Sequence, residues 1–78
     1  MDKKPDGKAR DKFIELAEKR VSRTIKDIRL VGNLSNRSNY SYTQDDVRKI
    51  IKALRDEVDA LKARFEATGS ESKPVFKL

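Results

Sequence analysis

The chain has 78 residues, of which 41% are charged and 36% hydrophobic, and its formal net charge at pH 7 is +6. This length allows one small domain with a thin core. The sequence contains no histidine and no cysteine, which excludes zinc sites built on those residues, disulfide scaffolds, thiol nucleophiles and imidazole acid–base catalysis.

A first helix is predicted over residues 9–31, after a basic arm at residues 1–8 that we expect to be disordered. At about 100° per residue, most apolar side chains of this helix fall within one arc of about 120°, which we call the apolar arc. The members of the arc that we expect in an interface are Ile14, Val21, Ile25 and Ile28. Gly32 and Asn33 follow, and both tolerate the left-handed backbone conformation that often ends a helix.

Residues 32–43 are predicted to form a loop, because serines and asparagines interrupt the apolar pattern there. Arg37, Tyr40 and Tyr42 lie in this loop. Arginine and tyrosine are residue types that stack on nucleic-acid bases or anchor protein interfaces. The alternative is that one tyrosine packs over the end of the helices, while the asparagines and serines satisfy the turn.

The loop also carries a resemblance to known proteins. Its run LSNRSNY at residues 34–40, followed by Tyr42 and Thr43, resembles the loop of small proteins from bacteria and their mobile elements. The similarity extends over about residues 16–65. It implies a bacterial or phage setting and no defined activity.

A second helix is predicted over residues 44–67, where Thr43 and Asp46 approximate a capping box at its start. Its apolar residues recur at spacings of 4, 3, 4, 3 and 4, the pattern of a coiled-coil seam. This apolar seam consists of Val47, Ile51, Leu54, Val58, Leu61 and Phe65. We expect residues 68–78 to form a flexible tail.

Two helices of similar length joined by one loop predict an all-α fold, an antiparallel, coiled-coil-like two-helix hairpin. If the two helices align antiparallel over their full length, Glu18 would meet Arg55 and Asp11 would meet Lys62. Each of these exposed ion pairs would add only about 0.2–1 kcal/mol to the free energy of unfolding. A hairpin leaves part of each apolar face open, so we expect a homodimeric four-helix bundle or a larger complex to cover it. The apolar residues expected at the edges of these faces are Leu16, Leu30, Leu34 and Ile50.

The net positive charge lies outside the second helix, in which acidic and basic residues are equal in number. The first helix brings five cations within about 60° of one another, opposite the apolar arc and with no acidic residue among them. This basic stripe consists of Lys8, Lys12, Lys19, Arg23 and Lys26. It predicts contact with nucleic-acid phosphates, with a solvated surface or an acidic protein partner as the alternatives.

Nothing in the sequence predicts catalysis. Asp56 and Asp59 can share a helix face, but Lys52, Arg55 and Lys62 lie within one turn, which indicates surface ion pairs. The three glycines are isolated, so no phosphate-binding loop is present. We therefore expect no enzyme activity, cofactor, metal or small-molecule substrate.

The function predicted is that of a small, non-enzymatic helical-hairpin binding protein. It would contact nucleic acid or a ribonucleoprotein through the basic stripe and the loop. The alternative is an adaptor, small subunit or inhibitor that docks on a larger assembly through the apolar seam. No more than two bulky apolar residues are adjacent anywhere in the chain, so we expect a cytoplasmic protein without a membrane segment.

Overall fold

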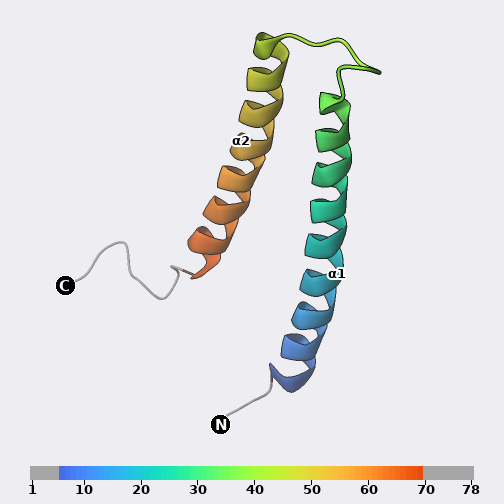
Figure 1. Cartoon of the computed structure of the whole chain (residues 1–78). Coiled ribbons are helices and arrows are strands. Elements are labelled where there is room, and N and C mark those ends of the chain that lie inside the picture. The colour runs from blue at the N-terminus through green and yellow to red at the C-terminus, as the bar shows by residue number, and fades with distance from the viewer. Residues whose placement is uncertain (1–5, 70–78) are drawn as a thin grey trace, which may run out of the picture. The chain divides into compact units, whose positions relative to one another are not determined.

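The computed structural model describes residues 6–69, which form two long α-helices joined by a short 3-10 turn and a loop (Figure 1). Helix α1 spans Asp6–Gly32, the turn η1 spans Asn33–Ser35, and helix α2 spans Gln44–Gly69. No β-strand occurs within residues 6–69, so the predicted all-α class is confirmed for this part of the chain. Most of the expected arm and tail lies outside the described residues.

The chain divides into two units, which we describe separately. The first runs to Ser41 and contains α1, η1 and most of the loop; the second begins at Tyr42 and contains α2. Each helix agrees with the predicted one over most of its length. Helix α1 begins at Asp6, a few residues before the expected start near residue 9, and α2 continues to Gly69 where an end near residue 67 was expected.

Helix α1 ends at Gly32, next to the predicted end at residue 31, but Gly32 does not adopt the left-handed conformation that it tolerates. Gly32 keeps right-handed helical dihedrals, φ −59° and ψ −30°, and the chain tightens into η1 beyond it. The N–H of Asn36 donates to the carbonyl of Asn33 at 3.3 Å, and Asn36 itself is extended, at φ −71° and ψ 101°. This end needs no left-handed residue, because 3-10 hydrogen bonds can serve the terminal carbonyls that a left-handed residue would otherwise satisfy.

Asn36 also organises the loop that follows. Its side-chain oxygen accepts a hydrogen bond from the N–H of Ser38 at 2.9 Å, as in an Asx turn. Its carbonyl accepts from the N–H groups of Asn39, at 3.1 Å, and Tyr40, at 3.0 Å. These short-range bonds order the backbone up to Tyr40, as expected if the asparagines satisfy the turn.

Helix α2 starts with the predicted capping box. The N–H of Asp46 donates to the Thr43 hydroxyl oxygen at 3.0 Å, and the N–H of Thr43 donates to the Asp46 carboxylate at 2.8 Å. Two N–H groups near the helix start are thereby satisfied reciprocally. Asp45 and Asp46 also place negative charge in the first turn, where the helix dipole favours it.

The described residues contain no buried core. No side chain among residues 7–68 is fully buried, and only a few are half-buried. The half-buried residues are Leu16, Ala17, Tyr42, Val47 and Leu54. Most helical stability in proteins comes from packing of an apolar face. Each helix therefore has an exposed apolar face, whose burial against another surface would stabilise it.

Replacing Thr43 by alanine should lower the free energy of unfolding by about 1 kcal/mol, because it removes one half of the capping box. Amide hydrogen exchange should then show lost protection in the first turn of α2. Thr68→Ala is the matched control, since the Thr68 hydroxyl bonds only back to the Arg64 carbonyl, at 3.0 Å, within the same helix. Equal losses in the two variants would contradict a capping role for Thr43.

Candidate nucleic-acid interface

All five residues of the basic stripe lie on α1 and are exposed. From Lys8 to Lys26 the stripe extends about 27 Å along the helix, at about 1.5 Å per residue. Its angular width of about 60° corresponds to roughly 5–6 Å at the outer radius of a helix. The structure thus presents a long and narrow row of cations on one helix.

The charges of α2 are partly paired, whereas those of the basic stripe form no ion pair with any residue that the structure describes. Three ion pairs between residues four apart lie along α2: Lys49–Asp45 at 3.4 Å, Lys52–Asp56 at 2.9 Å and Lys62–Glu66 at 3.9 Å. Within the described residues, no cation of the basic stripe forms an ion pair. The stripe therefore keeps its charge available to an anionic ligand, while part of the charge of α2 is neutralised locally.

The pairing of Asp56 with Lys52 confirms that this carboxylate belongs to a surface ion pair. Lys62 is close to Glu66 of its own helix, and the expected register pairs between the helices remain predictions.

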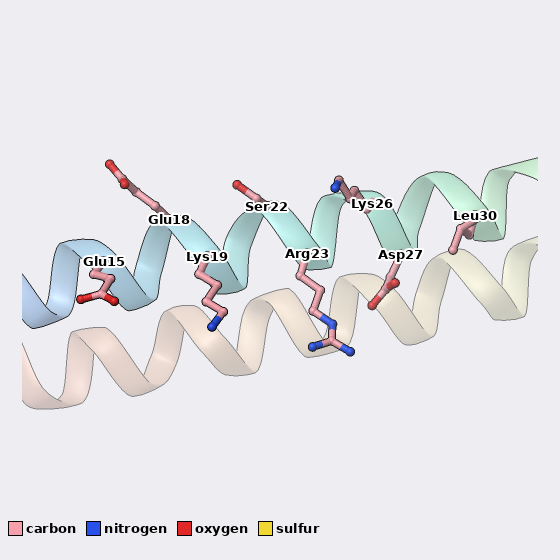
Figure 2. Close-up of a pocket in the computed structure, with 8 residues that line it drawn as sticks. All are labelled: Glu15, Glu18, Lys19, Ser22, Arg23, Lys26, Asp27 and Leu30. Carbon is pink, nitrogen blue, oxygen red and sulfur yellow. The ribbon is translucent and has the colours of Figure 1, made fainter.

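Acidic residues border the basic stripe. Figure 2 shows an open depression along α1, lined by three cations of the stripe together with carboxylates and two further residues. The lining residues are Glu15, Glu18, Lys19, Ser22, Arg23, Lys26, Asp27 and Leu30. Lys19 and Arg23 extend to one side of the helix in this view, and Glu18 extends to the other. The sequence reasoning passed over these flanking carboxylates, although the same helical geometry places Glu15 and Asp27 next to the stripe.

Leu30 was expected at the edge of the apolar arc, but the structure places it on the other side of α1, beside the basic stripe. It lines the depression with Arg23 and Lys26 and is 62% exposed. The reason is helical periodicity, since Leu30 follows Lys26 by four residues and Arg23 by seven, and such residues share one face. An apolar side chain therefore ends the basic stripe toward the loop.

Of the three loop residues predicted to bind, two belong to the same unit as the basic stripe. Arg37 and Tyr40 precede Ser41 and are exposed, with Tyr40 at 48%. Tyr42 is half-buried and begins the other unit. The structure therefore associates Arg37 and Tyr40 with the C-terminal end of α1.

The residues predicted to form an interface are almost all exposed. In the apolar arc, Val21 is 56% and Ile25 43% exposed. On the same helix, the guanidinium carbon of Arg10 lies 5.8 Å from the centre of the Phe13 ring. In the apolar seam, the three residues nearest the C-terminal end are more than half exposed, and only Val47 and Leu54 are half-buried. Contiguous apolar faces of this kind mark interaction surfaces.

Comparison of the chain with protein families, with curated proteins and with solved structures gave no match. The bacterial or phage setting suggested by the loop therefore remains an expectation. Within the part of the chain that the structure describes, no group of three or more acidic side chains could hold a metal ion. Neither α1 nor α2 is apolar enough over its length to cross a membrane.

The different pairing of the two helices predicts different responses to salt. Lys8 and Lys12, like Lys19 and Arg23, are like charges four residues apart, a spacing that destabilises a helix by about 0.2–0.5 kcal/mol per pair. Salt screens this repulsion in α1 and weakens the attractive pairs of α2. In α1 salt also screens the attraction of Glu15 for Lys19 and of Arg23 for Asp27, so the two effects there offset each other. Amide exchange resolved by residue should therefore show protection falling in α2 and changing little in α1 as salt is added. A uniform response of both helices would contradict the charge distribution described.

Proposed function

We propose that this protein is a non-enzymatic helical binding protein that holds nucleic-acid phosphates along the basic stripe of α1. The observation that supports this proposal is the row of five exposed cations, none of which is ion-paired within residues 7–68. Contacts of this kind neutralise phosphates and release counterions, without reading base sequence. Arg37 and Tyr40 would add polar and stacking contacts at the loop, and a ribonucleoprotein could be bound in the same way.

Packing of the apolar faces against each other would leave the basic stripe exposed to solvent. The stripe lies nearly opposite the apolar arc around α1, so covering the arc leaves the stripe in solvent. The helices are similar in length, 27 residues in α1 and 26 in α2. This similarity supports an antiparallel hairpin, in which the apolar arc packs on the apolar seam.

One hairpin buries little surface, and small scaffolds of this kind are commonly stabilised by association. We therefore propose that two copies form a four-helix bundle. Its two basic stripes would face outward.

The second candidate is a protein-interaction adaptor or inhibitor that docks on a larger assembly through the apolar seam. The exposure of Val58 at 57%, Leu61 at 53% and Phe65 at 59% favours it, since these residues form one continuous apolar face. In that case the partner would replace the second copy, and nucleic acid would be unnecessary.

Neutralising the basic stripe should weaken binding to nucleic acid and flatten its salt dependence. The variant Lys19→Gln, Arg23→Gln and Lys26→Gln removes three positive charges from the stripe. Because each lost phosphate contact lowers the slope of log K against log salt by about 0.7–0.9, we expect the slope to fall by about 2–3. Fluorescence anisotropy with a labelled oligonucleotide over a salt series measures both quantities.

The matched control is the variant Lys49→Gln, Lys52→Gln and Lys62→Gln, which removes the same charge from the ion-paired face of α2. It should retain nearly all of the binding. Equal losses in the two variants would show that net charge alone governs binding. Absence of binding at low salt would contradict the proposed function and leave the adaptor as the better account.

A charge placed in the apolar seam should dissociate the bundle. Leu54→Asp puts a carboxylate on the apolar face, where its burial in an interface costs several kcal/mol. Sedimentation equilibrium should give the mass of two chains for the natural protein and of one chain for this variant. Ala63→Asp is the control, because Ala63 lies on the opposite side of α2 and is exposed. A monomeric natural protein would instead favour the adaptor.

A further inference from the structure

We infer that the nucleic acid held by the basic stripe is single-stranded, with one backbone lying along α1 and its unstacked bases meeting Leu30 and Tyr40. This inference rests on the proposed function and specifies its ligand. Three features of α1 and the loop support it: the narrowness of the stripe, its straightness, and the apolar side chains at one end.

The width of the stripe matches one backbone. Its cations cover roughly 5–6 Å across the helix, whereas the major groove of B-form DNA, bordered by a backbone on each side, is about 12 Å wide. A helix inserted in that groove would bring its flanks toward phosphates. By helical geometry, Glu15 and Glu18 border the stripe on one side and Asp27 borders it on the other, and all three line the depression with its cations. Their carboxylates would be repelled by the phosphates, so the acidic borders disfavour groove insertion and leave one strand in register with the cations.

The straightness of the stripe points to the same ligand. Five cations follow the axis of one helix over about 27 Å. A duplex is stiff, with a persistence length of about 50 nm, and each of its backbones winds away from a straight line. A single strand is flexible and can follow a straight row of cations over its whole length. The same five residues can therefore contact more phosphates of a single strand than of a duplex.

At the loop end of the basic stripe, Leu30 and Tyr40 are exposed and could contact the unstacked bases of a bound strand. Leu30, 62% exposed, follows Lys26 on the same face, and Tyr40, 48% exposed, lies in the loop beyond the end of α1. The backbone of Tyr40 is held by its N–H bond to the Asn36 carbonyl at 3.0 Å, so the ring is presented from an ordered loop. Stacked bases of a duplex hide the faces that an aromatic ring would contact, whereas a single strand exposes them.

The test compares a labelled mixed-sequence strand of about 15 nucleotides, as DNA and as RNA, with the blunt duplex of the same length in about 50 mM salt. We expect the natural protein to bind the single strand at least about tenfold more tightly, although the duplex has the higher charge density. Equal or tighter binding of the duplex would overturn this inference and leave the proposed function standing. Binding of neither probe would overturn both.

Tyr40 provides a second readout that is independent of charge. Tyr40→Ala should weaken binding of the single strand by about tenfold, within the range measured for loss of a base–aromatic stack, and Tyr40→Phe should retain it. The chain has two tyrosines and no tryptophan, so in a Tyr42→Phe variant the tyrosine fluorescence comes from Tyr40 alone. The single strand should quench this fluorescence. Unchanged fluorescence, together with full binding by Tyr40→Ala, would overturn the stacking role.

Discussion

The feature on which the rest of this structure depends is the exposure of one apolar face on each helix. The apolar arc of α1 and the apolar seam of α2 are built from Ile, Val, Leu and Phe at helical spacing, yet no side chain within residues 7–68 is fully buried. Burial of such side chains is the main favourable contribution to folding, and helices gain most of their stability from it. The exposed faces are therefore the strongest physical argument that this chain works with something packed against it. In our account, that cover is the other helix and a second copy.

The distribution of charge determines what the proposed assembly would present to solvent. Three basic residues of α2 pair with carboxylates of the same helix, so much of its charge is neutralised within about one turn. The basic stripe of α1 has no such pairs among the described residues and lies opposite the apolar arc. In the function that we propose, one face of α1 serves assembly and the other serves binding. Acidic residues beside the stripe confine its positive charge to a line, and on this geometry we base the proposal that one nucleic-acid backbone, and not a duplex groove, is bound.

Local sequence signals predicted the elements well, because each depends on residues a few positions apart. Apolar periodicity gave both helices, and Thr43 with Asp46 gave the capping box, whose two hydrogen bonds the structure contains. Helix α1 ends at Gly32, next to the predicted end at residue 31, and Gly32 remains right-handed because glycine permits a left-handed conformation without requiring it. Leu30 and the acidic flanks could have been found from the helical wheel, because the same periodicity that groups the cations places these residues within or beside the stripe. Which residues of α1 face which residues of α2 cannot be derived from residues a few positions apart. Ile, Val and Leu are nearly interchangeable partners across an interface, so the apolar pattern does not specify one alignment.

The central claim is that the two apolar faces stabilise both helices only when they are covered by association. Amide hydrogen exchange across a wide range of protein concentration tests this claim directly. The account predicts that protection in the middle of α1 and α2 rises together as concentration increases, because folding and association are coupled. Equal and strong protection of both helices at the lowest and highest concentrations would contradict it, since the helices would then be stable without a second copy.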